Sequence, residues 1–367
     1  MMRGAVVTVV LLAAVAAALP ADARHADTFP NVDVFSVTLA GTERNLTANA
    51  ALDTQPATAP DGRTIAFVSS RSGAPDLYLM NAAGGNVRRL TTSPFTAAGA
   101  GSQMVSWGDF DVGGTTVAWS PDSRRLAFSA LNSELDPSCF RDCYSPSVFT
   151  IGADGTGLRL VDTSARNPVW SPNGKLLAYE GDVAPFGEAN AYYVVRVTGG
   201  GKVRIPAYDG DSAPPAWSPD SRRLAFQTFR HQRIPAEIDV VDATGKHRRK
   251  LTIGYEPAWS PLGPIAFVRG QRLHAIAANG TGDRILTRPG ESAFSPAWSP
   301  AAKRVAFTVR TAKAKRCQVA TVDLPSGVER QLTHEPLRAT LDSGPVWAPS
   351  GKSMVFARWQ PPSGGCG

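Results

Sequence analysis

The side chains that most often carry acid–base or metal chemistry in proteins are thinly spread in this sequence. Among its 367 residues there are five histidines, at positions 25, 231, 247, 274 and 334. Neutral imidazole is the commonest metal ligand, and its charge changes near neutral pH. His231, His274 and His334 lie far apart in the chain and occupy different positions relative to the strands expected below. We therefore predict isolated histidines and no metal centre.

One acidic pair is a weaker signal for a bound cation. Asp109 and Asp111 flank Phe110 within a glycine-rich segment, residues 101–114. Alternating carboxylates are typical of calcium loops, but the full pattern of three alternating acids followed by glycine is absent. The sequence predicts no catalytic residue and no cofactor, and it leaves Ca²⁺ at this pair open.

The first 23 residues have the three parts of a secretory signal peptide. Arg3 provides the positive charge, residues 4–19 form the apolar run, and Ala-Asp-Ala at 21–23 is the small-residue cleavage site. The apolar run is shorter than the ~20 residues that a membrane-spanning helix needs. We predict cleavage after residue 23 and an exported chain, extracellular or periplasmic, that folds as a single domain over residues 24–367.

The four cysteines are expected to form disulfides, because an even number in an exported chain favours pairing. Cys139 and Cys143 belong to one polar loop, which leaves Cys317 and Cys366 for each other. We predict the bonds Cys139–Cys143 and Cys317–Cys366, although four cysteines allow three pairings. A zinc site is the alternative, but the spacing is not that of paired zinc ligands and no histidine is close.

A motif containing Pro-x-Trp-Ser-Pro, a turn and Leu/Ile-Ala-Phe recurs along the chain. Its copies, some of them incomplete, occupy residues 56–67, 117–128, 168–179, 215–226, 257–267, 296–307 and 345–356. Proline, aspartate and glycine at the centre are turn residues, and the flanking apolar segments are typical of strands. Each copy therefore predicts a β-hairpin.

A second pair of strands around a glycine-rich turn follows each hairpin, most clearly at residues 77–91, 148–160 and 273–287. A unit of four strands and about 48 residues has the size of a β-propeller blade. Six of the eight tryptophans occupy one position of the motif. We expect these six rings to lie between blades.

The chain ends determine the number of blades. The last hairpin, residues 345–359, has no second pair of strands, whereas an unmatched second pair, residues 34–47, precedes the first hairpin. We predict an all-β, seven-bladed propeller over residues 33–359, with six or eight blades as alternatives. The N-terminal strands should complete the C-terminal blade, because closure removes exposed sheet edges.

The repeat resembles the WD40-like repeat of TolB-type β-propellers, most clearly in residues 60–91, which contain Pro-Asp-Gly, Ile-Ala-Phe, Leu-Tyr-Leu-Met-Asn and Arg-Arg-Leu-Thr. TolB is periplasmic, carries an α/β domain before its propeller and binds a peptidoglycan-associated lipoprotein. The resemblance implies a protein-binding propeller, here without the N-terminal domain. Prolyl oligopeptidase-like peptidases have similar repeats, but the G-x-S-x-G motif of their hydrolase domain is absent.

We expect a monomeric binding or scaffolding module, not an enzyme. Propellers usually bind partners at one mouth of the channel, where loops enter the innermost strands. The candidate contact residues there are Arg166, Asn167, Tyr255, Glu256, Phe294 and Ser295. Tyr255 and Phe294 directly precede a rigid strand, which would hold an aromatic contact at little entropic cost.

The expected partner is an envelope or extracellular protein, with a glycan as a further option. The net charge is +7, but the basic clusters are short and no nucleic-acid-binding module occurs. One alternative is a polysaccharide lyase or another glycan-acting enzyme, because propeller lyases have similar repeats with several histidines around a metal. A purely structural surface protein is the other.

Overall fold

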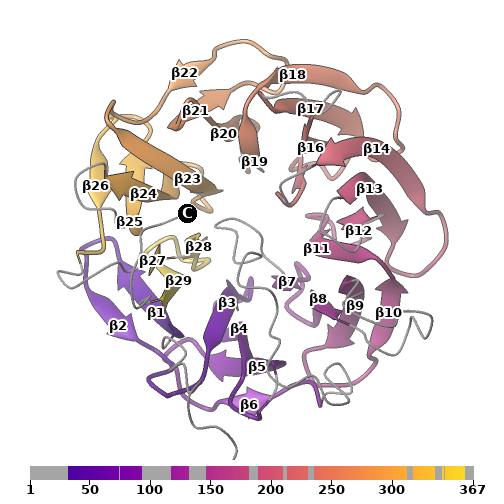
Figure 1. Cartoon of the computed structure of the whole chain (residues 1–367), viewed down its shortest axis with the longest axis vertical. Helices are drawn as coiled ribbons and strands as arrows, with labels where there is room; N and C mark the ends of the chain where they lie inside the picture. The colour runs from indigo at the N-terminus through magenta and orange to yellow at the C-terminus, as the bar shows by residue number, and fades with distance from the viewer. Residues whose placement is uncertain are drawn as a thin grey trace, which may run out of the picture. The chain divides into compact units, whose positions relative to one another are not determined.

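The described strands form a ring of four-stranded blades, two of which are joined in one larger sheet (Figure 1). A computed structural model describes residues 32–73, 75–92, 117–131, 146–181, 189–209, 213–229, 235–311, 317–334, 341–342 and 344–359. Within these ranges the chain forms strands and turns, and no helix. Residues 31–367 form one compact unit. The predicted all-β fold is confirmed.

The blades are numbered in chain order, and the strands of each run from the channel outward. Blade 1 contains β3 (Asp53–Thr58), β4 (Thr64–Ser69), β5 (Asp76–Asn81) and β6 (Arg88–Arg89); blade 2 contains β7 (Val117–Trp119), β8 (Arg125–Leu131), β9 (Pro146–Gly152) and β10 (Arg159–Asp162); blade 3 contains β11 (Ala165–Trp170), β12 (Leu176–Gly181), β13 (Ala189–Arg196) and β14 (Val203–Asp209); blade 4 contains β15 (Ala216–Trp217), β16 (Arg223–Thr228), β17 (Glu237–Asp242) and β18 (Arg249–Ile253).

The remaining strands complete the ring. Blade 5 contains β19 (Tyr255–Trp259), β20 (Ile265–Arg269), β21 (Arg272–Ile276) and β22 (Arg284–Ile285); blade 6 contains β23 (Glu291–Trp298), β24 (Arg304–Thr311), β25 (Cys317–Asp323) and β26 (Glu329–Gln331); blade 7 contains β28 (Val346–Trp347), β29 (Ser353–Trp359), β1 (Val32–Thr38) and β2 (Glu43–Asn45). The prediction of seven blades is confirmed.

Blade 7 closes the ring with strands from both ends of the propeller. β1 pairs antiparallel with β29 in a continuous register from Val32↔Trp359 to Thr38↔Ser353. β27 (Leu341–Asp342) pairs with both β25 and β29 and so joins blades 6 and 7 in one sheet. The predicted completion of the last blade by the N-terminal strands is confirmed.

The repeated tryptophans connect the blades. The indole Nε1 of Trp119 in blade 2 donates a hydrogen bond to the carbonyl of Ala57 in blade 1, at 2.9 Å. Four other pairs of adjacent blades are joined by the same hydrogen bond, with donor and acceptor Trp170–Ala118, Trp217–Val169, Trp298–Ala258 and Trp347–Ala297. The indole nitrogen of Trp259 is buried and has no partner among the described residues. The predicted interblade position of the tryptophans is confirmed.

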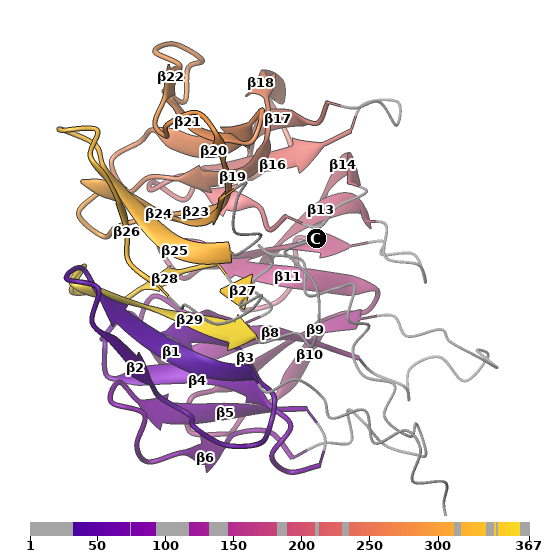
Figure 2. The same ribbon diagram turned by 60° about the vertical axis from the view of Figure 1, so that its left-hand side comes forward.

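The two ends of the ring differ in construction. All innermost strands run in the same direction, so the seven hairpin turns that follow them lie at one end, which we call the turn end. These turns occupy residues 59–63, 120–124, 171–175, 218–222, 260–264, 299–303 and 348–352. We call the opposite end, where the innermost strands begin, the channel mouth. β29 ends there, as its arrowhead shows in Figure 2.

Candidate binding site at the channel mouth

Four innermost strands share an unusual backbone conformation at the mouth. Gln55, Asn167, Glu256 and Ser295 each precede a proline and have φ between 51° and 53°. The left-handed region is rarely populated by residues other than glycine. The following proline has no N–H to give to the second strand, and the register shifts at this point in all four blades. The result is a β-bulge at the same place in four blades.

The backbone N–H of the left-handed residue bonds to a side chain of the preceding blade. Asn167 donates to Ser129 Oγ at 3.0 Å, and Glu256 donates to Gln227 Oε1 at 3.0 Å. Both acceptors directly follow the aromatic residue of a second strand. These bonds fix the beginning of one blade's innermost strand against its neighbour.

Blade 6 achieves the same result with a different acceptor. In blade 5 the residue after the second-strand aromatic is Val268, which has no side-chain acceptor. The N–H of Ser295 donates instead to Glu256 Oε2, at 2.5 Å. Glu256 therefore receives a backbone bond from blade 6 while its own N–H is held by blade 4.

A buried carboxylate lies at the corresponding position of blade 3. The side chain of Glu180 is 0% exposed and accepts hydrogen bonds from Arg166 Nε at 2.8 Å and from Asn167 Nδ2 at 2.9 Å. Blade 4 has Pro214 at the position where a left-handed residue would offer its N–H to Glu180. The side chains of Arg166 and Asn167, on blade 3 itself, satisfy the carboxylate instead. Burial raises the pKa of Glu180, and the charge of Arg166 and the hydrogen bond of Asn167 oppose that rise.

Two half-buried aromatic side chains precede the left-handed residues of blades 5 and 6. Tyr255 packs against the cluster of buried residues that blades 5 and 6 share, and its ring is 6.4 Å from the ring of Phe229. Phe294 has the same repeat position one blade further on and pairs in register with Thr308. Because adjacent bulges hold them, these rings lie on a fixed backbone.

The structure divides the six predicted contact residues into two groups. Tyr255, Glu256, Phe294 and Ser295 lie on adjacent blades, joined by the bond between Glu256 and Ser295. Arg166 and Asn167 lie on blade 3 and are joined through Glu180. Their binding role stays a prediction.

Three mouth residues were missed at the sequence level: Ser129, Glu180 and Gln227. The available signal was their shared place directly after the aromatic residue of a second strand.

The histidines in the described residues are engaged in local contacts. His274 Nδ1 is 3.0 Å from Asp283 Oδ1, and its ring stacks on Phe267 with centroids 5.3 Å apart. Burial lowers the pKa of His274. His334 Nδ1 is 3.1 Å from the amide nitrogen of Gln331. Over the described ranges, no three His, Cys, Asp or Glu side chains gather as metal ligands would.

Several expectations lie wholly or partly outside the described residues. Cys317 is buried at the start of β25 and is disulfide-bonded. The other cysteines (139, 143 and 366), Asp109 and Asp111, His231 and the signal peptide fall outside the described ranges, so both disulfide pairings stay predictions. In the part of the chain that the structure describes, no helix has the length and apolar character needed to cross a membrane.

Fold and site together define a closed β-propeller with a structured channel mouth. The family model for the TolB beta propeller domain matches residues 145–364, more than half of the chain. The chain therefore belongs to the TolB β-propeller family.

Individual relatives are distant. The Tol-Pal system protein TolB of Francisella tularensis subsp. mediasiatica is 22% identical over 209 residues, covering 54% of this chain and 46% of that protein. The TolB homolog of Chlorobium luteolum is 28% identical over 172 residues, covering 46% of this chain and 32% of that protein. The chain spans less than half the length of these curated relatives.

Solved structures share the fold. A putative TolB from Agrobacterium tumefaciens aligns over 90% of this chain and 98% of that chain, with a TM-score of 0.53 and 18% identity. The β-propeller domain of the Trilobed protease from Pyrococcus furiosus aligns over 84% and 92%, with a TM-score of 0.58 and 12% identity. At these identities the likeness concerns the fold alone.

Proposed function

We propose that this protein is an exported, non-catalytic binding module of the cell envelope, which recognises a protein partner at the channel mouth. The bond from Ser295 N–H to Glu256 Oε2 carries the proposal, because it locks the backbone beside Tyr255 and Phe294 on neighbouring blades. Family membership supports it, since curated relatives are described as Tol-Pal system proteins. Export rests on the predicted signal peptide, and the periplasm is the proposed location.

Recognition would work by surface complementarity. Tyrosine is enriched among the residues that dominate binding energy, and a rigid aromatic side chain loses little entropy on contact. The bulges arrange these rings before a partner arrives, so less ordering cost accompanies binding. Arg166 on blade 3, whose Nε is bonded to the buried Glu180, forms a second, polar part of the proposed site.

The test is affinity capture from envelope extract with immobilised protein, compared by quantitative mass spectrometry. The double variant Tyr255→Ala/Phe294→Ala should lose a partner that the wild type retains, because two aromatic contacts at a binding centre contribute about 100-fold or more in affinity. Ile285→Ala is the matched control, since Ile285 is a 51% exposed apolar residue on the outermost strand β22, away from the channel mouth. Its captured set should equal that of the wild type.

The alternatives have their own readouts. Equal capture by all three proteins would contradict a role for the mouth, provided that thermal unfolding shows the double variant to be folded. Cleavage of an acidic polysaccharide into unsaturated products by the purified protein would favour the lyase alternative. A protein that captures nothing and cleaves nothing would favour a structural role.

A further inference from the structure

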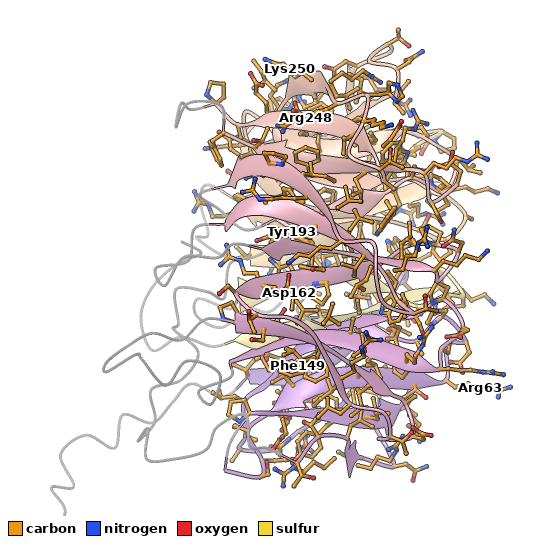
Figure 3. The ribbon with its side chains drawn as sticks, turned by 90° about the vertical axis from the view of Figure 1, so that its right-hand side faces the viewer. Arg63, Phe149, Asp162, Tyr193, Arg248 and Lys250 are labelled. Carbon is orange, nitrogen blue, oxygen red and sulfur yellow. The ribbon has the colours of Figure 1, made fainter. Side chains whose placement is uncertain are left out.

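The turn end carries a ring of basic side chains that the proposed function does not use. Six of the seven hairpin turns place a lysine or arginine at the same position, directly after the residue with positive φ: Arg63, Arg124, Lys175, Arg222, Lys303 and Lys352. All six are exposed. Figure 3 shows Arg63 projecting from this end of the ring.

The backbone explains the position of these residues, but not their charge. In each of the six blades the carbonyl of the basic residue accepts a hydrogen bond from the turn between the third and fourth strands, as Ala82 N–H donates to Arg63 at 3.0 Å. Any residue type could supply that carbonyl. Across the described ranges, the six side chains make no hydrogen bond, ion pair or ring contact. The fold therefore does not need the positive charges.

Neighbouring acids reduce the charge of this end without cancelling it. Asp61, Asp122 and Asp220 lie in three of the turns, and each is held within its own turn. Hydrogen bonds from Ser120 and Ser218 lower the pKa of Asp122 and Asp220, so both stay ionised near neutral pH. Within the seven turns, the six basic side chains therefore outnumber the three acidic ones twofold.

The shape of the turn end favours a flat partner. The turns share one hydrogen bond, from the residue with positive φ to the residue three positions earlier, as from Gly62 to Ala59 at 2.8 Å. Turns of the same geometry, repeated around one axis, place their side chains at one level. A flat surface can meet all six cations at once, whereas a linear polymer crosses only some of them.

The seventh turn points to lipid. Blade 5 has Pro264 in place of the basic residue, and its turn presents Leu262, whose exposed fraction of 78% is the largest among the exposed large hydrophobic residues described. An exposed apolar side chain within a cationic ring suits the boundary between head groups and acyl chains. We propose that the turn end binds an anionic phospholipid surface, which leaves the channel mouth facing away from the membrane and free for its partner.

The test is co-sedimentation of the full-length protein with vesicles of phosphatidylcholine mixed with phosphatidylglycerol. The triple variant Arg124→Gln/Lys175→Gln/Arg222→Gln removes three adjacent cations of the ring. Each basic side chain near an anionic surface contributes about fivefold to affinity, so the variant should bind about 100-fold more weakly. Pure phosphatidylcholine vesicles measure any contribution of the apolar N-terminal segment, which all variants share.

The matched control is Arg44→Gln/Arg284→Gln/Arg330→Gln, which makes the same charge change at exposed positions on the outermost strands β2, β22 and β26. It should retain the wild-type affinity within about fivefold. Equal losses in the two triple variants would overturn the proposal, because binding would then follow net charge alone.

Two other outcomes would also overturn it. One is undiminished vesicle binding by the ring variant. The other is ring-dependent binding to heparin without binding to the anionic vesicles, which would assign the ring to a soluble polyanion. Tyr255→Ala/Phe294→Ala should leave vesicle binding unchanged, so this experiment is independent of the proposed function of the mouth.

Discussion

The channel mouth and the turn end are built from the same repeat, but they use it differently. At the turn end each hairpin closes on itself, with short bonds such as Ser123 N–H to Ser120 O at 2.9 Å. At the mouth the bulges are satisfied across blades, as between Ser295 and Glu256. The turn end is a set of similar local units, whereas the mouth depends on which residues its neighbours supply.

The two ends also differ in the burial and hydrogen-bond partners of their carboxyl groups. Glu180 at the mouth is fully buried and depends on Arg166 and Asn167. Asp122 and Asp220 at the turn end stay largely exposed and are bonded to their own turns. Removing a mouth residue should therefore disturb the neighbouring structure, whereas removing a turn residue should change mainly the surface.

The largest effect is expected from Glu180→Ala. The variant removes the carboxylate that pairs with the guanidinium of Arg166. The Arg166 side chain is only 13% exposed, so water cannot fully replace that carboxylate. Breaking one side of a buried ion pair costs about 3–5 kcal/mol of unfolding free energy. Urea unfolding followed by tryptophan fluorescence measures this loss.

The control at the turn end is Asp220→Ala, whose carboxylate accepts its hydrogen bonds from Ser218 and Arg222 of its own turn. We expect it to change the unfolding free energy by less than about 1 kcal/mol. Similar losses in the two variants would remove the distinction between the ends.

The contributions of these carboxyl groups to the unfolding free energy should change with pH in opposite directions at the two ends. The raised pKa of Glu180 means that the folded state holds a proton more tightly than the unfolded chain, so its contribution to stability falls as pH rises above the unfolded value. The lowered pKa values of Asp122 and Asp220 make their contribution fully present above the unfolded value and lost as pH falls through the folded one.

Unfolding free energies measured across acidic pH separate these contributions. Asp122→Asn/Asp220→Asn should flatten the acid side of the profile, and Glu180→Gln should flatten the decline on the higher-pH side. A profile that neither variant alters would show that these carboxyls do not control the pH dependence.

The sequence predicts the fold well because each blade repeats its own local signals. The tryptophan motif and its turn residues define a hairpin in every copy, and the unmatched strands at 34–47 reveal the closure. The channel mouth is harder to predict from the sequence, because the side chains that accept its hydrogen bonds come from neighbouring blades. Glu180 accepts hydrogen bonds from Arg166 and Asn167 of its own blade, since Pro214 of the next blade has no N–H to donate. The basic ring was also hidden, since the cations are about one blade apart in sequence and only the fold gathers them.

A smaller effect should test the interblade hydrogen bonds that five of the repeated tryptophans make. Trp119→Phe removes the indole donor to the buried carbonyl of Ala57, whereas Trp259→Phe removes an indole whose nitrogen has no partner among the described residues. Both variants lose the same volume. An unsatisfied buried carbonyl costs about 1–3 kcal/mol, so Trp119→Phe should be less stable by about that difference. Equal unfolding free energies would mean that packing, not the hydrogen bond, holds the blades together.

The smallest effect concerns the turn end alone. Ala302 has φ of 53° in the hairpin turn of blade 6, where blades 1, 3, 5 and 7 have glycine. A left-handed residue other than glycine costs about 1–2 kcal/mol, partly offset by the greater freedom of glycine in the unfolded chain. Ala302→Gly should therefore raise the unfolding free energy by about 0.5–1 kcal/mol. Ser123→Gly is the matched comparison at φ of 59°, but Ser123 Oγ also accepts a bond from Asp61 N–H of blade 1, at 3.0 Å. Loss of that bond should cancel the gain in unfolding free energy from glycine, so Ser123→Gly should be about as stable as the wild type. A Ser123→Gly variant more stable than the wild type would show that this contact between blades is dispensable. The turns would then act as independent units.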